Sequence, residues 1–197
     1  MKLAHEFEVA APVETVWDLL LDLERVAPCL PGGEVTGKID DTRYNVMVKI
    51  KLGPLALTYR GEISIVETDK DARKVVMEGK ASESHGQGTA RATISTLLES
   101  RAGLTHAQVE TDLHLTGRVA QMGRGIVEEV SGRMIGEFAR CLSATAAAAN
   151  TRAGDAAPIL EPPPRARPVS MLQLLRATLR SLSRSLVNSL RRRRKGD

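Results

Sequence analysis

The feature that most constrains this chain is the contrast between residues 33–116 and residues 119–149. In the later stretch, apolar side chains recur every three or four positions, which is the spacing of one face of an α-helix. Most of the earlier stretch alternates in the manner of β-strands. Because an apolar helix face must be buried, the sequence predicts one antiparallel sheet curved around one long helix. The apolar positions of that helix are Val119, Met122, Ile126, Val130, Met134, Phe138 and Leu142.

This predicted helix is unusually rich in glycine. Gly123, Gly125, Gly132 and Gly136 lie within it, and each costs about 1 kcal/mol relative to alanine in a helix interior. We expect them to thin the helix where it crosses the sheet, so that the backbones approach closely or room is left for a guest molecule.

The residues before the sheet predict one strand and one short helix. Residues 2–9 alternate, as in a strand with one buried face. Pro12 suits a first helical turn, and residues 13–24 carry an apolar stripe that ends near Pro28 and Pro31. Six further strands are expected, joined by short polar turns, which gives an α+β fold. Their ranges are 34–39, 44–51, 55–67, 74–82, 88–99 and 104–117.

Charge and proline content divide the chain into three parts. Residues 1–164 hold 18 Lys and Arg against 23 Asp and Glu, whereas residues 165–197 hold 10 against one. Residues 150–168 contain five of the nine prolines and predict an extended linker. We therefore expect a sheet-and-helix domain over 1–149 that binds a ligand, a Pro-rich linker over 150–168 and a separate basic amphipathic helix over 169–197.

The tail has the pattern of a helix that lies on an anionic membrane surface. Leucines fall on one side of the helical wheel, arginines fall on another, and a basic run ends the chain. Arginine at a bilayer centre costs roughly 2.5 to 3.5 kcal/mol, so a flat orientation is favoured over spanning. Docking on a protein partner and binding to nucleic acid are the alternatives, although phosphate binding needs no leucine stripe. The predicted membrane-binding residues are Leu175, Leu179, Leu182, Leu186, Leu190, Arg176, Arg180, Arg184, Arg191, Arg192, Arg193 and Arg194.

The two cysteines, Cys29 and Cys141, are far apart in the sequence and have no metal-ligand spacing. This favours reduced thiols in a cytoplasmic protein over a disulfide scaffold or a zinc site, and no metal is expected. The charged N-terminal residues do not resemble a signal peptide, and no run of about 18 uncharged apolar residues predicts a bilayer-spanning segment.

Three segments in order carry a family resemblance: PVETVWDLLLDLERVAPCLPGG, GPLALTYRGEISIVE and LTGRVAQMGRGIVEEVSGRMIGEF. Residues 1–148 resemble the CoxG family, the G subunit of carbon monoxide dehydrogenase, within the START-like, SRPBCC or helix-grip superfamily. The resemblance implies a curved sheet wrapped on a C-terminal helix with an apolar cavity between them. It also implies an accessory protein that recruits a molybdenum hydroxylase, such as carbon monoxide dehydrogenase, to the membrane and couples it to quinone.

The histidines give little sign of catalysis. His106, Glu110, Asp112 and His114 share one phase of the last strand, opposite an apolar phase, and so are expected to face water. His5 lies in the apolar phase of the first strand and is expected to be a half-buried, hydrogen-bonded residue rather than a ligand. No GxSxG, HExxH or phosphate-binding glycine loop is present.

The predicted cavity lining is uncharged. It could be a filled core, but aromatic residues make up only 3% of the chain, and methionine provides an adaptable apolar lining, so we expect a ligand pocket. The ligand would be an elongated apolar molecule such as a quinone or another isoprenoid lipid, with Tyr59 or the backbone near Gly123 and Gly125 offering a hydrogen bond. The lining residues are Val46, Val48, Leu57, Tyr59, Ile63, Met77, Ile94, Val109, Leu113, Met122, Ile126, Val130 and Met134.

We therefore expect a non-catalytic carrier of a hydrophobic ligand, without a cofactor of its own, peripheral on the inner face of the cytoplasmic membrane. A cyclase- or aromatase-like enzyme of the same superfamily is one alternative, and it would require ionisable side chains directed into the cavity. A purely structural membrane-anchoring scaffold with a filled core is the other alternative.

Overall fold

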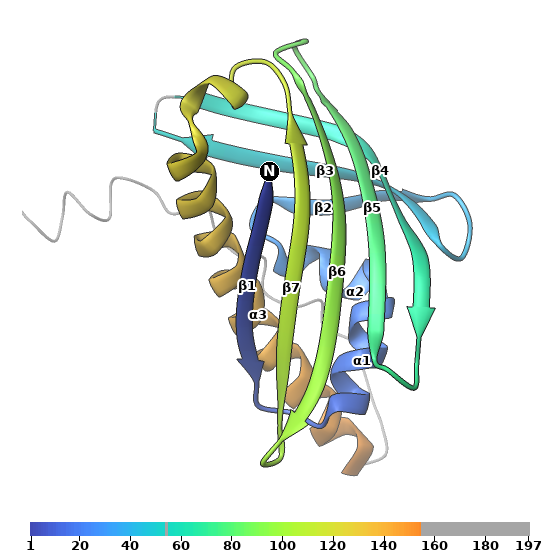
Figure 1. Cartoon of the computed structure of the whole chain (residues 1–197). Coiled ribbons are helices and arrows are strands. Elements are labelled where there is room, and N and C mark those ends of the chain that lie inside the picture. The colour runs from blue at the N-terminus through green and yellow to red at the C-terminus, as the bar shows by residue number, and fades with distance from the viewer. Residues whose placement is uncertain (54, 155–197) are drawn as a thin grey trace, which may run out of the picture. The chain divides into compact units, whose positions relative to one another are not determined.

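A seven-stranded antiparallel sheet curves around one long helix, α3 (Figure 1). The computed structural model describes residues 1–53 and 55–154, with side chains as far as residue 149. The strand order is β1-β7-β6-β5-β4-β3-β2, so the first strand pairs with the last. The elements are β1 (Lys2–Val9), α1 (Val13–Leu21), α2 (Leu23–Val26), η1 (Ala27–Cys29), β2 (Gly33–Lys38), β3 (Arg43–Leu52), β4 (Leu55–Asp69), β5 (Lys74–Glu83), β6 (Thr89–Arg101), β7 (Leu104–Leu115), η2 (Ala120–Met122) and α3 (Arg124–Gly154).

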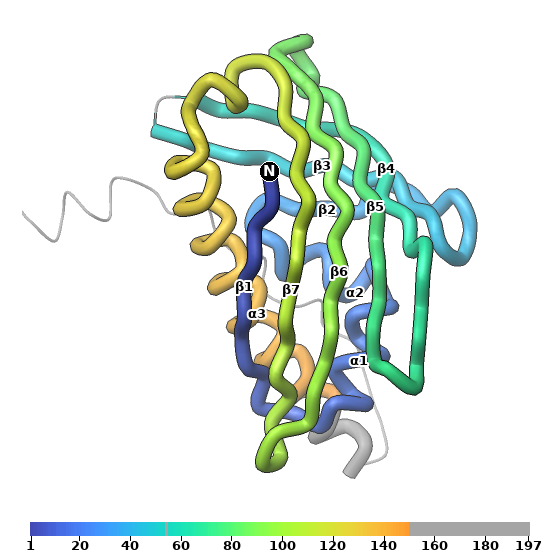
Figure 2. The backbone as a smooth tube through the Cα atoms, in the orientation of Figure 1, coloured from blue at the N-terminus to red at the C-terminus, as the bar shows by residue number. Residues whose placement is uncertain are grey.

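The sheet confirms the α+β prediction and the C-terminal position of the long helix. Each strand from β3 to β7 pairs with the strand made just before it, as expected for successive hairpins. β1 instead pairs with β7, with Lys2 opposite Asp112 and Val9 opposite Thr105. Figure 2 traces α3 past β1, which is the strand that the helix contacts most.

Two clusters of buried apolar side chains pack on different parts of the sheet. One packs α1 and the later part of α3 on the sheet and includes Val16, Trp17 and Leu142. The other includes Leu57, Tyr59 and Val127 and lies near the start of α3.

The long helix begins later than predicted. Residues 120–122 form the short 3₁₀ helix η2, and Gly123 then adopts φ +85°, a left-handed conformation that ends η2 before α3 starts at Arg124. At the other end α3 continues past Ala149 to Gly154. The start predicted at Val119 was therefore wrong, because the apolar periodicity runs through a turn that only the backbone reveals.

The predicted role of the helix glycines was largely wrong. A Cβ placed on Gly125 or Gly136 would meet nothing within 4 Å, and Gly123 lies outside the helix. Only Gly132 faces the sheet, where its Cβ would lie 3.8 Å from the Cε1 atom of His5. None of these four glycines borders the cavities described below.

The expectation of reduced cysteines was also wrong. Cys29 of η1 and Cys141 of α3 form a disulfide, with their Cα atoms 5.2 Å apart. The fold places Cys29, the last residue of η1, against α3. The two cysteines are 112 residues apart in the sequence, so the sequence does not show that they meet.

The linker predicted over 150–168 begins too early, because α3 continues to Gly154. The rest of the predicted linker, from residue 155 onward, and the tail helix predicted over 169–197 lie outside the described residues. Among the residues that the structure describes, no helix is long and apolar enough to cross a membrane.

Candidate functional site

Two adjoining apolar chambers lie between the sheet and α3. The inner chamber, of about 210 Å³, is bordered by α1, α2 and the middle of α3, including Leu20, Val26 and Phe138. The outer chamber, of about 330 Å³, lies between the sheet and the first half of α3. The chambers share the wall residues Leu30, Val46, Val48, Ile63 and Ile94.

Small residues on β5 and β6 leave the space of the outer chamber. Gly79 and Ala81 of β5 and Ala90 and Ala92 of β6 line it side by side, since Gly79 pairs with Ala92 and Ala81 with Ala90. A Cβ on Gly79 would meet nothing within 4 Å. Small side chains on the sheet, rather than glycines in the helix, therefore provide the space of the chamber.

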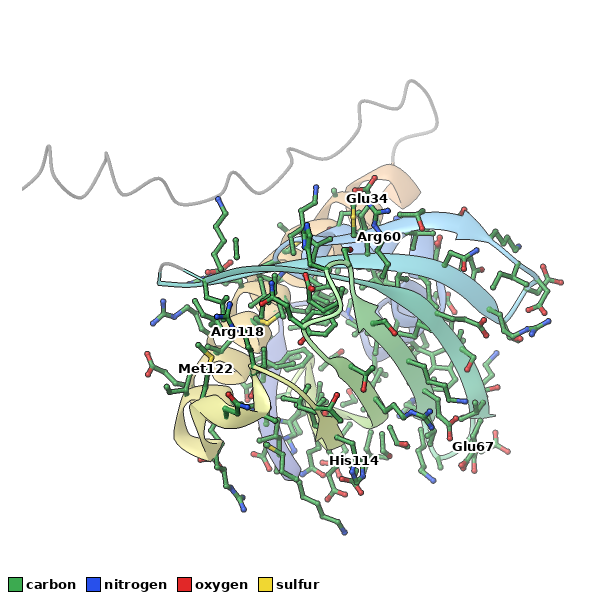
Figure 3. The ribbon with its side chains drawn as sticks, turned by 90° about the horizontal axis from the view of Figure 1, so that it is seen from above. Glu34, Arg60, Glu67, His114, Arg118 and Met122 are labelled. Carbon is green, nitrogen blue, oxygen red and sulfur yellow. A yellow bond between two sulfur atoms is a disulfide. The ribbon has the colours of Figure 1, made fainter. Side chains whose placement is uncertain are left out.

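A surface groove of about 440 Å³ borders the outer chamber. It runs between the end of β3 on one side and η2 and α3 on the other, and it shares apolar residues of all three with the outer chamber, among them Leu52, Met122 and Ile126. The Ile126 side chain is 44% exposed, and Lys49, Lys51 and Arg133 also border the groove. Figure 3 shows Met122 at this end of the molecule, with Arg118 nearby.

The predicted lining residues border these chambers with one exception. Leu57 is 2% exposed and packs within the second apolar cluster instead. α1, α2 and η1 contribute a further wall that was not predicted, because the strand and helix patterns do not show where these short segments pack. The predicted residues found at the chambers are Val46, Val48, Tyr59, Ile63, Met77, Ile94, Val109, Leu113, Met122, Ile126, Val130 and Met134.

Tyr59 of β4 is the notable polar residue of the outer chamber. It is 5% exposed, and within the described part of the chain its hydroxyl has no hydrogen-bond partner and no contact with solvent. Burial, followed by the negative charge of Glu83, raises the pKa of Tyr59. The group therefore remains a protonated donor at neutral pH.

The other polar residues of the outer chamber are already accounted for. The Ser131 hydroxyl is hydrogen-bonded to the Glu128 carbonyl and, at 2.9 Å, to His5 Nε2. His5 is thus half-buried and hydrogen-bonded, as expected. Glu62 and Lys80 border the chamber from strand positions whose side chains alternate with those of Ile63 and Gly79, and so point to the opposite face of the sheet.

The polar row of β7 was predicted correctly except at His106. Glu110 and His114 are exposed on the outer face, but His106 is only 7% exposed, and neither ring nitrogen has a hydrogen-bond partner among the described residues. Its register neighbours are Glu8 and Glu99, and Glu6 Oε2 lies 3.6 Å from its Nε2. The prediction failed there because flanking long side chains can cover a residue on an outer face.

Glu83, at the end of β5, is a buried carboxylate that the sequence reasoning missed. It accepts hydrogen bonds from the backbone amides of Thr58, His85 and Gln87, and its Oε1 lies 3.3 Å from His85 Nδ1. Burial opposes ionisation, but these donors outweigh it and lower the pKa of Glu83 to about 2. The arrangement fixes the β5–β6 turn. Within the described ranges, no group of three or more His, Cys, Asp or Glu residues could hold a metal ion.

A curved antiparallel sheet that holds a C-terminal helix above an apolar cavity defines the START-like, or helix-grip, class. Solved structures share this fold at low sequence identity. A conserved protein from Geobacillus kaustophilus has 18% identity and a TM-score of 0.68, over 76% of this chain and 97% of that one. A START superfamily protein from Mycobacterium smegmatis has 13% identity and a TM-score of 0.51, over 75% and 98%. The Zhui aromatase/cyclase from Streptomyces sp. R1128 has 16% identity and a TM-score of 0.55, over 79% and 96%.

The sequence itself identifies the family. Residues 6–147 match the CoxG family, the G subunit of carbon monoxide dehydrogenase, and the chain belongs to that family. No curated protein matched the chain.

Proposed function

We propose that this protein is a non-catalytic carrier of an elongated hydrophobic molecule, a quinone or another isoprenoid lipid. The observation that carries the proposal is the pair of adjoining apolar chambers, which open to the exterior beside α3. Pockets for small molecules are mostly apolar with a few placed polar groups, and these chambers have that character.

The proposed carrier serves a molybdenum-hydroxylase type carbon monoxide dehydrogenase, which it recruits to the cytoplasmic membrane and couples to quinone. The family name supports the enzyme partner. The leucine stripe and arginines of residues 169–197 support attachment to an anionic membrane surface. The proposal places the protein on the inner face of the membrane, although a disulfide such as Cys29–Cys141 is rare in cytosolic proteins.

An aromatase- or cyclase-like enzyme is the second candidate, because an aromatase/cyclase shares the fold. Such chemistry needs a positioned acid or base. Among the described residues that line the outer chamber, Tyr59 has an ionisable side chain on the inner face of the sheet. Its raised pKa makes it a poor base at neutral pH. This favours the carrier function over the enzyme.

Ligand binding can be tested with 2-farnesyl-1,4-benzoquinone, which displaces a fluorescent apolar probe if the chambers accept it. We expect saturable displacement by the full chain and loss of it in Gly79→Leu, whose side chain would occupy the outer chamber. Thr93→Leu is the matched control, because Thr93 is exposed on the neighbouring strand, opposite Glu78. Failure of the wild-type protein to bind, together with no lipid in solvent extracts of it, would refute the carrier function and leave the cyclase-like enzyme and the scaffold as the alternatives.

Membrane attachment is tested by vesicle flotation. We expect the full chain to float with anionic vesicles and less so at high salt, and we expect deletion of residues 169–197 to abolish flotation. Unchanged flotation after the deletion would refute this part of the proposal.

A further inference from the structure

The outer face of the sheet, opposite the two chambers, carries cations on three successive strands. Arg60 of β4, Lys80 of β5 and Arg91 of β6 are all exposed and border one surface hollow of about 380 Å³. Each alternates along its strand with residues that line the outer chamber, so the three side chains lie on the outer face. We call these three residues the outer basic patch, and Figure 3 labels Arg60.

The outer basic patch is unpaired, unlike most cations of the domain. Eight other lysine and arginine side chains each lie beside a carboxylate. Within the part of the chain that the structure describes, no ion pair or hydrogen bond engages the side chains of Arg60, Lys80 and Arg91. Glu62, which is opposite Lys80, also borders the hollow but forms no ion pair with a described residue. Cations therefore predominate here, although residues 1–164 hold more acidic than basic residues.

The pairing register brings these like charges close together. Lys80 is directly opposite Arg91, and Arg60 is opposite Ser82, two positions along β5 from Lys80. Like charges directly opposite each other on antiparallel strands destabilise the pairing. The fold keeps this repulsion without a counter-charge of its own in ion-pair contact, which points to anionic groups that are supplied from outside.

We propose that the outer basic patch docks an acidic segment of a partner protein, whose carboxylates pair with Arg60, Lys80 and Arg91. Hydrogen bonds between such cations and carboxylates are among the stronger ones in proteins. Because neighbouring strands lie about 4.8 Å apart, a segment with several carboxylates matches the three cations better than one small anion. Asn45 and Ser82 border the same hollow and offer neutral hydrogen-bonding groups. This inference goes beyond the carrier function, because the patch and the chambers lie on opposite faces of the sheet.

An anionic membrane fits this face less well than a protein segment does. Glu6 of β1 and Glu110 of β7 are exposed on the same outer face. A flat anionic surface laid on this face would be repelled by these carboxylates, whereas a protein segment can follow the patch alone.

The test follows the binding of a hexaglutamate peptide to the full chain by amide NMR, which locates the contact residue by residue. We expect the amide signals of β4, β5 and β6 beside the patch to shift saturably, and the affinity to fall at high salt. Combining Arg60→Gln, Lys80→Gln and Arg91→Gln should weaken this binding about tenfold, the joint effect of three exposed ion pairs. Peptide bound to the basic residues 165–197 is distinguished by the signals of those residues.

The matched control removes the same charge from exposed cations that do not share a hollow. It combines Lys2→Gln, Lys70→Gln and Arg140→Gln, and it should leave the shifts at the patch unchanged. The patch variant should melt cooperatively, at or above the wild-type temperature, because it removes the repulsion between Lys80 and Arg91. A lower melting temperature would show that these cations stabilise the fold itself and would overturn the proposal.

Other results would also overturn the docking role. One is an equal loss of peptide binding in the patch and control variants, or shifts confined to other residues. Loss of flotation with anionic vesicles in the patch variant would assign the patch to the membrane, and conversion of a wild-type dimer to a monomer would assign it to a second copy of the chain. The carrier function is tested separately by quinone displacement, so neither result decides the other.

Discussion

Cys29 and Cys141 are joined by a disulfide that ties η1 to α3 across a sequence separation of 112 residues. A link of this length restricts the unfolded chain strongly, and the chain-entropy relation gives about 4 to 5 kcal/mol for a loop of this size. We therefore expect Cys141→Ser to lower the free energy of unfolding by up to this amount, measured by urea denaturation.

The control for this prediction is a reductant, because these are the only two cysteines of the chain. Reduction should shift the wild-type urea midpoint toward that of Cys141→Ser and should leave the variant where it is. A wild-type midpoint that does not respond to reductant would contradict the prediction.

Glu83 should make stability depend on pH in the acid range. Its pKa is lowered from the ordinary glutamate value of 4.5 to about 2 in the folded protein by the three backbone amides and His85. A lowered folded-state pKa stabilises the fold fully above about pH 4.5, and this contribution is lost as the pH falls toward about 2. Glu83→Gln should be less stable than the wild type at pH 7 and should lose less stability on acidification.

Thermal melts between about pH 7 and about pH 2 cover the range in which this contribution is lost and provide the measurement. Glu110→Gln is the control, since Glu110 is exposed on the outer face of β7. Parallel pH profiles for Glu83→Gln and the wild type would show that the carboxylate does not fix the turn.

Gly79 of β5 and Gly61 of the neighbouring strand β4 should respond in opposite ways to alanine. Gly79→Ala adds a methyl group where nothing lies within 4 Å, and it should stabilise the fold by about 0.4 to 1 kcal/mol by restricting the unfolded chain. Gly61→Ala would overlap the Lys80 carbonyl oxygen and the backbone of Ala81, and it should destabilise the fold by at least about 1 to 3 kcal/mol. Chemical denaturation measures both effects, and the same sign for the two variants would disprove the geometry.

The His5–Ser131 hydrogen bond, at 2.9 Å, ties β1 to α3. We expect a double-mutant cycle with His5→Phe and Ser131→Ala to give a coupling energy of about 0.5 to 1.5 kcal/mol. Ser131→Ala combined with Arg133→Ala, an exposed residue on the same helix, supplies the reference cycle. A His5–Ser131 coupling no larger than that reference would show that the contact contributes nothing.

The sequence predicted the fold well because strand alternation and helix periodicity are local properties. The same alternation placed Val46, Tyr59 and Ile94 on the inner face, where they border the chambers. It could not predict which distant segments meet. The Cys29–Cys141 link and the wall formed by Leu20 and Val26 depend on how α1, α2 and α3 close over a curved sheet. The burial of His106 depends on neighbouring strands, whose register sets it beside Glu8 and Glu99.

The prediction assigned the open space beside the helix to glycines of the helix, but the space of the outer chamber comes from the sheet. Glycines in the predicted helix suggested a thinned helix, whereas Gly79 and Ala92, on paired strands, provide the room. From the sequence alone, a glycine or alanine in a strand indicates only a low β-propensity. The pairing register is needed to show that several such residues lie side by side and leave an open space.

The pairing of β1 with β7 also bears on how the protein is made. On the ribosome β1 is synthesised first, yet its partner, which ends at Leu115, leaves the exit tunnel only after every other strand has emerged. Until then the nascent β1 exposes unpaired backbone groups, a template for aggregation. Glu6 and Glu8 alternate with Phe7 and Val9 in this strand, and charges in such positions disfavour pairing with a neighbouring chain.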